Sequence, residues 1–168
     1  MYMHLTEFTD NALRLLIYLG GQKPGPDGRL ATIGAIAERY GVSRHHLAKV
    51  SCLLASAGLI ETSRGRQGGM RLAGAPRDIR LGEVVRCTER GLGQAGAAPA
   101  AGQRRGAANE RLHQSLALAT AAYLAELDRV TLADLLPAGP EHDDAEGLPD
   151  WLAPNVWRWQ YSALEEGA

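Results

Sequence analysis

The stretch from Thr32 to Leu72 constrains the fold most, because caps, periodic apolar residues and glycines divide it into short elements. Thr32 can cap a first helix, and Gly41 can take the left-handed conformation that ends it. Ser43 is then a good N-cap for a second helix, which Gly58 stops. The apolar residues of both helices recur at intervals of three and four, as one buried face of each requires. They are Ile33, Ile36, Ala37 and Tyr40 in the first helix and Leu47, Val50 and Leu54 in the second.

Two short strands are expected after these helices, from Leu59 to Ser63 and from Met70 to Ala73. The segment between them, RGRQGG, contains glycines that let the chain reverse tightly. A helix, a tight turn, a second helix and a hairpin in this order predict a winged helix-turn-helix. The fold class is therefore mainly α with a small β-hairpin wing.

Side chains with hydrogen-bond donors gather at the start of the second helix and at the tip of the hairpin. In helix-turn-helix proteins the first residues of the second helix meet base edges in the major groove, where Arg, Lys and His suit guanine acceptors and phosphates. Arginine and glutamine at a wing tip suit a narrow minor groove or its flanking phosphates. The candidate DNA-binding residues are Ser43, Arg44, His45, His46, Lys49, Arg64, Arg66, Gln67 and Gly68.

The distribution of charge favours DNA binding over two plainer interpretations, a protein interaction module and a solvated arginine-rich loop. Between Arg39 and Arg80 there are eight Lys and Arg residues against two acids, although the whole chain has a formal net charge of -1. Basic charge is thus concentrated where DNA would lie. We expect Arg66→Ala to weaken operator binding without unfolding the protein, and an unchanged affinity at fixed salt would exclude that role for the wing.

The rest of the chain divides into segments of different composition. Residues 1–90 hold the winged helix-turn-helix, with an opening helix at 5–20 that Thr6 or Thr9 can cap and a short amphipathic helix over 81–88. Residues 91–106 are expected to form a Gly/Ala-rich loop. Residues 107–136 hold a long helix, which is expected to measure some 35 Å. A turn with a capping box from Thr131 to Asp134 follows this helix. Residues 137–150 read as an acidic, proline-rich linker, and 151–168 as a tail with all three tryptophans, which we expect to dock rather than stay exposed.

Several classes of protein are disfavoured. No apolar run is long enough to span a membrane and no signal peptide is recognisable, so the cytoplasm is the expected location. The sequence shows no phosphate-binding glycine loop, nucleophile elbow or apolar pair of carboxylates, so we expect no enzyme and no catalytic residue. The five histidines form no metal-binding pair at helical spacing, and no metal is assigned.

Four segments of the chain resemble the family of winged-helix repressors that includes NsrR, IscR and CymR. The segments are residues 5–14, residues 36–44 together with 46–47, residues 64–69 and residues 131–136. The resemblance implies a bacterial transcription regulator, with residues 81–88 connecting the DNA-binding unit to a sensor region. It also implies a homodimer joined through the long helix, which suits the two-fold symmetry of most operators.

The resemblance also implies an iron-sulfur cluster in the nitric-oxide and iron-sulfur branches, held by three cysteines before the long helix. Residues 91–111 of this chain contain no cysteine. Cys52 is expected near the core, Cys87 is a buried residue or a lone thiol sensor, and Asp10 matches a carboxylate ligand of the nitric-oxide branch. Three explanations stay open: a cluster-free member that answers to another effector, such as a small molecule near the tryptophan tail; cysteines replaced by alanine; or a mixed site drawn from Cys87, Glu7, Asp10, Glu110 or His113.

The sequence therefore predicts a homodimeric regulator, most simply a repressor, that binds a palindromic operator with the second helix and the wing. It is expected to respond to an effector without the usual three-cysteine iron-sulfur site, so no cofactor is assigned. The alternative from another class is a DNA-independent interaction module or a binder of apolar ligands. Salt-dependent binding to mixed DNA separates the two interpretations, because neutralising several phosphates makes affinity fall steeply with salt.

Overall fold

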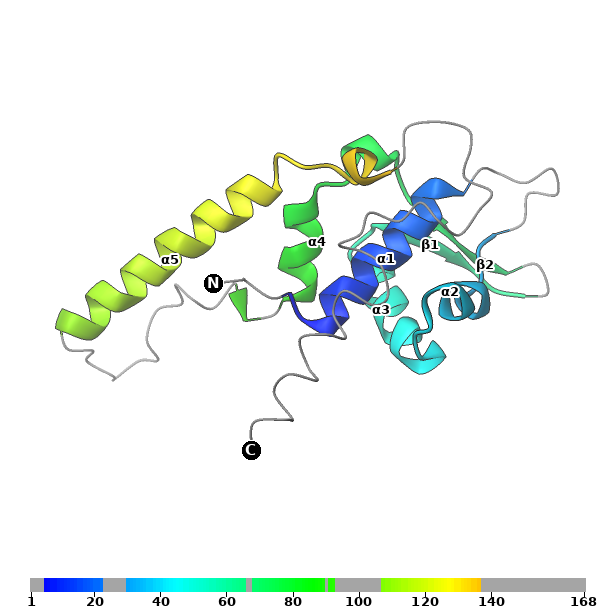
Figure 1. The fold of residues 1–168 in the computed structure, drawn as a ribbon, viewed down its shortest axis with the longest axis horizontal. Coiled ribbons are helices and arrows are strands. Elements are labelled where there is room, and N and C mark those ends of the chain that lie inside the picture. Colours follow the sequence, from blue (N-terminus) through cyan, green and yellow to red (C-terminus); the bar gives the residue numbers. More distant parts are fainter. Residues whose placement is uncertain (1–4, 23–29, 66–67, 90, 93–106, 137–168) are drawn as a thin grey trace, which may run out of the picture.

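The computed structural model describes residues 5–22, 30–65, 68–89, 91–92 and 107–136 (Figure 1). Its helices, strands and short 3-10 turns occur in the order α1 (Glu7–Gly21), α2 (Ile33–Tyr40), α3 (Arg44–Ser56), β1 (Ile60–Ser63), β2 (Gly69–Leu72), η1 (Pro76–Asp78), α4 (Leu81–Thr88), α5 (Ala107–Leu127) and η3 (Leu132–Leu135). The predicted winged helix-turn-helix is confirmed, and each predicted element is present within a few residues of its expected bounds. The predicted sensor loop from 93 to 106, the acidic linker and the tryptophan tail lie outside the described residues.

Helix α1 is the central element of the core. Thr6 caps it, since the Thr6 hydroxyl accepts a hydrogen bond from the Thr9 backbone N–H at 3.3 Å. Nine of its residues are buried, among them Leu15 and Leu16 with no exposed surface. Because α1 packs against α2, α3, α4 and β2, its leucines fill the interior that all these elements share. Burying side chains of this size contributes about 1.5–3 kcal/mol each, and this is the main force that holds the elements around α1.

The turn between α2 and α3 forms as the caps and glycine predict. The Thr32 hydroxyl accepts from the Ala35 N–H, and Gly41 ends α2 at a φ of 65°. Ser43 occupies the N-cap position of α3, but its side chain makes no capping hydrogen bond; its backbone oxygen accepts from the Leu47 N–H at 3.0 Å instead. Leu47, Val50 and Leu54 face the core, with 0–1% of their surface exposed.

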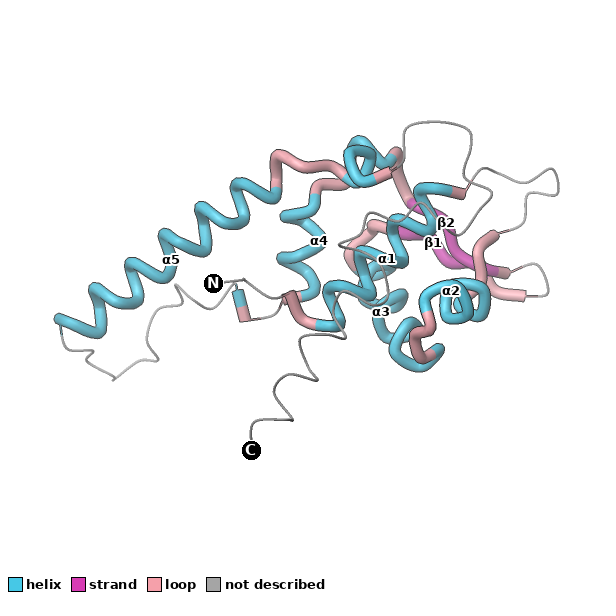
Figure 2. The backbone as a smooth tube through the Cα atoms, viewed as in Figure 1, coloured by secondary structure: helices cyan, strands magenta, loops and turns pink. Residues whose placement is uncertain are grey.

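The hairpin pairs β1 with β2 in an antiparallel register that sets Glu61 opposite Arg71 and Ser63 opposite Gly69. Ala31 extends this sheet by an isolated bridge to Met70, whose side chain is buried. Figure 2 shows the two strands at the end of the molecule opposite α5. The wing is thus fixed to the core at its base.

Helices α4 and α5 differ in how they are packed. Leu81, Val84, Val85 and Thr88 of α4 are all buried, as their spacing predicts. Helix α5 projects away from the other elements and lies beside α4 near its own C-terminal end (Figure 1). After α5, η3 returns to the core with Leu132 fully buried, and the Asp134 carboxylate accepts from the Thr131 N–H at 2.8 Å, as the expected cap requires. We call α1 to α4, the hairpin, η1 and η3 the compact unit.

No described helix is both long enough and apolar enough to cross a lipid bilayer.

Candidate nucleic-acid interface

The outward face of α3 carries the row of side chains that the sequence predicts for DNA contact. Arg44, His45 and Lys49 are exposed. Arg44 lies near the start of α2, because a Cβ built on Gly34 would be 3.7 Å from its Nη2 atom. Ser43 is exposed beside them at the helix N-terminus, where a hydroxyl or a backbone N–H can donate to a phosphate. None of these four side chains is part of the core, and all of them present hydrogen-bond donors to the solvent.

The same face continues toward the end of α3 with Cys52 and Ser56, both of which are exposed. The expectation that Cys52 lies near the core is wrong. Val50 and Leu54 are each two residues away from Cys52, a rotation of about 200° on a helix, so the buried face and Cys52 lie on opposite sides. Cys52 therefore extends the candidate interface.

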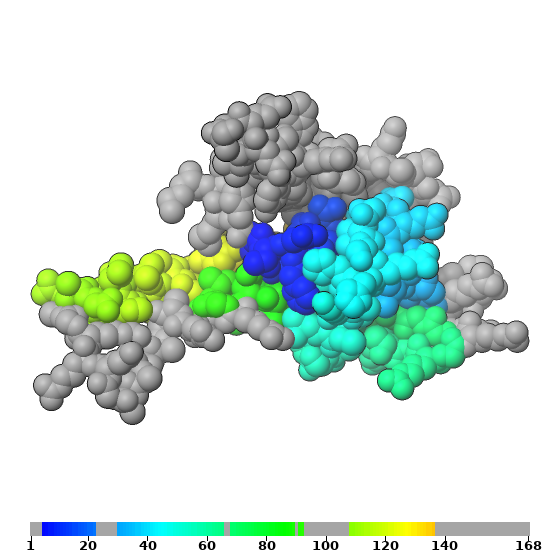
Figure 3. All heavy atoms as spheres, turned by 90° about the horizontal axis from the view of Figure 1, so that it is seen from below, coloured from blue at the N-terminus to red at the C-terminus, as the bar shows by residue number. Residues whose placement is uncertain are grey.

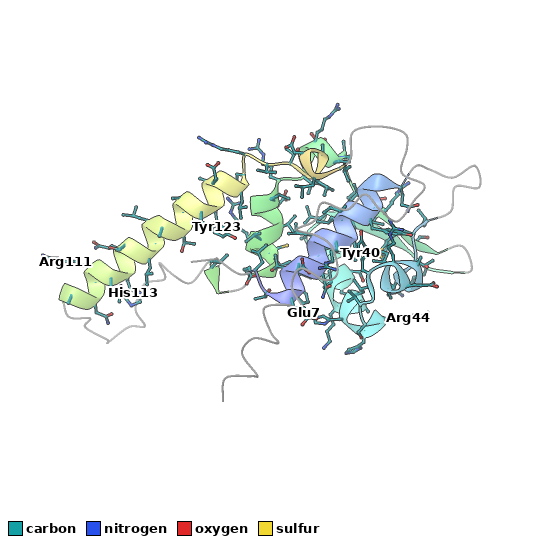
Figure 4. The ribbon with its side chains drawn as sticks, in the orientation of Figure 1. Glu7, Tyr40, Arg44, Arg111, His113 and Tyr123 are labelled. Atoms are coloured by element: carbon teal, nitrogen blue, oxygen red, sulfur yellow. The ribbon has the colours of Figure 1, made fainter. Side chains whose placement is uncertain are left out.

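His46 lies apart from this row, toward α1. Its side chain is 34% exposed, and its ring centroid is 6.1 Å from that of Phe8. Its Nδ1 atom is 3.8 Å from the Glu7 carboxylate. Of the four residues predicted to read the major groove, His46 is thus the one that also joins α3 to the first turn of α1. Figure 4 shows Glu7 and Arg44 on this side of the compact unit.

The described part of the wing has two exposed arginines, and one of them is paired with an acid. Arg64 is exposed at the end of β1. Arg71 donates to the Glu61 carboxylate from Nε at 2.8 Å and from Nη2 at 2.6 Å, so its charge is already paired. Gly65 has a φ of 111°, and the Gly68 N–H donates to the Gly65 carbonyl at 2.9 Å. The remaining predicted wing residues, Arg66 and Gln67, lie outside the described residues.

Gly68 is required by the tightness of this turn. A Cβ built on it would lie 2.6 Å from the Ser63 carbonyl oxygen and 2.8 Å from that of Gly65. A side chain at this position would force the hairpin open. Gly68 therefore shapes the wing, and its backbone is what it can offer to a phosphate.

The basic helix and the hairpin occupy one end of the molecule. Figure 3 shows α2 and α3 in cyan beside the blue-green hairpin, with α5 extending from the opposite end. A shallow hollow of about 920 Å³ borders α3 on the side of α1 and α4. Its lining includes His45, Lys49 and Cys52 from α3, together with Phe8 from α1 and Glu89 after α4.

Glu89 links the end of α4 to the start of α1 through hydrogen bonds. Its Oε1 atom accepts hydrogen bonds from the Thr6 N–H at 2.7 Å, the Thr6 hydroxyl at 2.8 Å and the Thr9 hydroxyl at 2.6 Å. Partial burial raises the pKa of Glu89, but these hydrogen bonds outweigh it and hold the pKa below its ordinary value of 4.5. Glu89 is therefore a stable anion beside the hollow and at the entrance to the predicted sensor segment.

Asp10 is paired within its own helix. Arg14 Nε lies 2.8 Å from Asp10 Oδ2, so the two side chains form an ion pair, although the Nε–H group does not point at the oxygen and makes no hydrogen bond. The Arg14 guanidinium also lies 5.9 Å from the centroid of the Tyr40 ring. Burial raises the pKa of Asp10, and the Arg14 charge opposes that rise. Asp10 thus has a structural partner in the described chain.

A helix-turn-helix with basic side chains on its outward face, followed by a hairpin wing, defines a winged-helix DNA-binding transcription regulator. The Rrf2 family, described as iron-dependent transcriptional regulators, matches residues 5–138. The chain belongs to this family.

The chain is similar to several members of this class. It is 40% identical over 144 residues to the HTH-type transcriptional regulator NsrR of Bacillus subtilis (strain 168), covering 80% of this chain and 90% of that protein. Among solved structures it resembles T. potens IscR, with a TM-score of 0.56, 25% identity and coverage of 86% of this chain and 94% of that one. It shares the fold of CymR of B. subtilis, with a TM-score of 0.58, 22% identity and coverage of 80% and 96%.

The family is described as iron-dependent, but the residues of this chain do not fit a three-cysteine iron site. The chain has two cysteines, on separate helices. The Cys87 thiol donates to the Val84 carbonyl at 3.0 Å, and burial raises its pKa, which disfavours the thiolate that iron requires. Among the described residues, no three His, Cys, Asp or Glu side chains lie close enough together to hold a metal ion. Glu7, Asp10, Glu110 and His113 are described, and they form no such group with Cys87.

Sequence reasoning missed two features of this interface. Helical geometry alone could have placed Cys52 on the outward face, but the usual burial of cysteine suggested otherwise. No local pattern could have found the Glu89 contact, because its partners lie 80 and 83 residues earlier in the chain.

Proposed function

We propose that this regulator is a homodimeric repressor that binds a palindromic DNA operator. Each subunit inserts the start of α3 into the major groove of one half-site, where Arg44, His45 and Lys49 contact base edges and phosphates. His46 contributes from the side that faces α1. Arg64, Arg66 and Gln67 of the wing contact the adjacent minor groove, with the Gly68 backbone close to the phosphates.

The observation that carries this proposal is the separation of the two faces of α3. Leu47, Val50 and Leu54 are buried, whereas Arg44, His45 and Lys49 are exposed. Three adjacent donors on an exposed helix contribute little to folding, and phosphate and guanine acceptors are the groups that match them.

The exposed leucines of α5 support the homodimer. Leu112, Leu116 and Leu118 are 56%, 47% and 72% exposed in the single chain. Leu112 and Leu116 are four residues apart and lie on the same side of this projecting helix of 21 residues, which is stabilised when a second copy covers that side. Two subunits related by a two-fold axis then present two recognition helices to the two halves of a palindrome.

The proposed effector acts where the Cys87 helix, the Gly/Ala-rich segment and α5 meet. Glu89 marks this place, because it ends α4, holds the start of α1 and borders the hollow beside α3. An effector there changes the spacing of the two recognition helices and releases DNA. With two cysteines in the chain, we propose a response that needs no three-cysteine cluster, in a cytoplasmic protein.

Operator binding by matched variants tests the proposal. Lys49→Ala should weaken binding by about 1–3 kcal/mol and lower the slope of log affinity against log salt, because a phosphate or guanine contact is lost from each half-site. Arg77→Ala is the matched control. Arg77 belongs to the basic stretch from Arg39 to Arg80, but it is exposed on η1, beside η3, and not on α3 or the wing, so its loss should leave binding unchanged. A wild-type protein whose binding to DNA does not depend on salt would contradict the proposal and favour a DNA-independent module.

A further inference from the structure

The last turn of α5 lies directly against the backbone of α4. Gly82, in the first turn of α4, is buried at this crossing. A Cβ built on Gly82 would lie 2.8 Å from Asp128 Cγ and 3.0 Å from the Leu124 carbonyl oxygen. The first contact is closer than real Cβ atoms allow and the second is tighter than most real Cβ contacts, so a side chain at residue 82 would force the Asp128 side chain or the last turn of α5 to shift.

Two arginines of the compact unit hold the residue that follows α5. Arg86 binds the Asp128 carboxylate through both of its terminal nitrogens, with Nη1 donating to Oδ1 at 2.9 Å and Nη2 donating to Oδ2. Arg80 Nη1 donates to the Asp128 backbone oxygen at 3.2 Å. A bidentate pair fixes direction as well as distance, so it orients the end of α5 relative to α4. We call Gly82, Arg86, Leu124 and Asp128 the α4–α5 junction.

The chain beyond this junction is fixed to the compact unit. The Leu81 N–H donates to the Val130 carbonyl at 3.0 Å, and the Leu132 N–H donates to the Ile79 carbonyl at 2.8 Å. Leu132 itself has no exposed surface. By contrast, most residues from 108 to 122 of α5 are exposed, and Tyr123, Leu124 and Leu127 are the half-buried residues nearest α4. The angle of the projecting helix is therefore set at one end.

A small change at that end becomes a large displacement at the other. At about 1.5 Å per residue, the 21 residues of α5 extend about 31 Å. A tilt of about 6° at the junction moves the far end by about 3.3 Å, which is close to the rise of about 3.4 Å per base pair of DNA.

We propose that the α4–α5 junction sets the spacing between the two recognition helices of the dimer and thereby the spacing of the half-sites that the protein accepts. Gly82 permits the close crossing, and Asp128 fixes its angle through Arg86. Both are positioning residues, since neither contacts DNA. The inference rests on the proposed homodimer on a palindromic operator, and its tests separate the two.

The first test measures the distance between recognition helices without DNA. Cys52 is exposed on α3, so in a Cys87→Ser background each subunit carries one spin label at Cys52. The full-length dimer with an intact junction should give one narrow distance distribution by double electron–electron resonance. Gly82→Ala should shift or broaden it because the new methyl group pushes α5 off α4, and Asp128→Asn should broaden it because the bidentate pair is lost.

The matched control for both variants is Glu126→Gln. It removes an exposed ion pair at the same end of α5, in which Glu126 is 3.2 Å from Arg129, but that pair does not reach α4. The control should reproduce the unsubstituted distance distribution. Unchanged distributions in folded Gly82→Ala and Asp128→Asn proteins would overturn the inference.

The second test measures DNA binding on duplexes whose two half-sites are separated by spacers differing in single base pairs. For unlabelled protein without the Cys87 substitution, one spacer should be preferred. The two junction variants should prefer another spacer or lose the preference, while their affinity for a single half-site stays that of the wild type. Should Gly82→Ala fail to fold, Asp128→Asn alone decides, because it preserves the size of the side chain.

The wild-type measurements show which idea fails. A wild-type protein that gives no inter-subunit distance, or that binds two half-sites no better than one, would overturn the homodimer proposal and this inference together. A wild-type dimer with a sharp spacer preference that both junction variants retain would overturn this inference alone.

Discussion

In the compact unit the leucines of α1 and two leucines of α3, Leu47 and Leu54, are buried, whereas Leu112, Leu116 and Leu118 of α5 are 56%, 47% and 72% exposed. Under the proposed homodimer, the same residue type thus serves two purposes in one chain. Leucines in short helices that are joined by tight turns pack against one another in the core of the same chain. Leucines on one long projecting helix are available to a second copy. The difference teaches that apolar periodicity alone cannot say which surface buries a side chain.

The largest expected effect separates these two purposes with one kind of substitution. Leu54→Ala should lower the free energy of unfolding by about 2–5 kcal/mol, because it leaves a cavity in a site with no exposed surface. Leu116→Ala should have little effect on the folding of the isolated chain and should instead weaken association. Urea unfolding, together with sedimentation equilibrium over a range of protein concentrations, distinguishes the two. The comparison breaks down if Leu116→Ala destabilises the monomer as much as Leu54→Ala does.

An intermediate effect is expected from the carboxylate that closes the compact unit. Because the pKa of Glu89 is lowered in the folded state, its contribution to stability is complete above its ordinary value of 4.5 and is lost as pH falls through the lowered folded value. Between about pH 5 and pH 3 the wild type should therefore lose more stability than Glu89→Gln, whose side chain does not ionise. Thermal unfolding as a function of pH measures this difference.

Thr9 provides the matched pair for that experiment. Thr9→Ser keeps the hydroxyl that donates to Glu89 at 2.6 Å and should keep the pH dependence. Thr9→Val removes the donor and should reduce it. Equal pH dependence in the wild type, Glu89→Gln and Thr9→Val would show that this contact does not stabilise the compact unit.

The smallest effect is expected at the hairpin surface. The Arg71 and Glu61 side chains face each other across the strands, but they are 67% and 54% exposed. Arg71→Ala should cost about 0–1 kcal/mol, because solvent screens exposed ion pairs. Chemical denaturation measures this cost. A loss as large as that of Leu54→Ala would mean that the wing, and not the buried leucines, holds the compact unit together.

The fold could be predicted from the sequence where a local signal decides the structure. Thr32, Gly41 and the spacing of Leu47, Val50 and Leu54 act within a few residues of themselves, and each is confirmed. Ser43 shows the limit of such signals. It stands at the expected N-cap, yet its side chain makes no capping bond, because the identity of a cap residue does not fix its rotamer.

The candidate interface could be predicted only in part. The exposure of Arg44, His45 and Lys49 follows from helical periodicity. The position of His46 beside Phe8 could not be foreseen, because it depends on how α1 crosses α3. The α4–α5 junction was equally hidden, since Gly82 and Asp128 lie far apart in the chain and only the fold brings them together.

The two faces of α3 also bear on how this protein can evolve. Selection for a stable fold acts on Leu47, Val50 and Leu54, while Arg44, His45, Lys49, Cys52 and Ser56 are exposed and free of the core. Substitutions along the exposed row can accumulate with little loss of stability. Because the proposed DNA contacts come from this row, a duplicated copy can acquire a new set of target genes before it loses its fold. Gly41, with a φ of 65°, ends the preceding helix and keeps the start of α3 in place during such changes. New regulatory circuits are therefore within reach of a few codon changes in one helix.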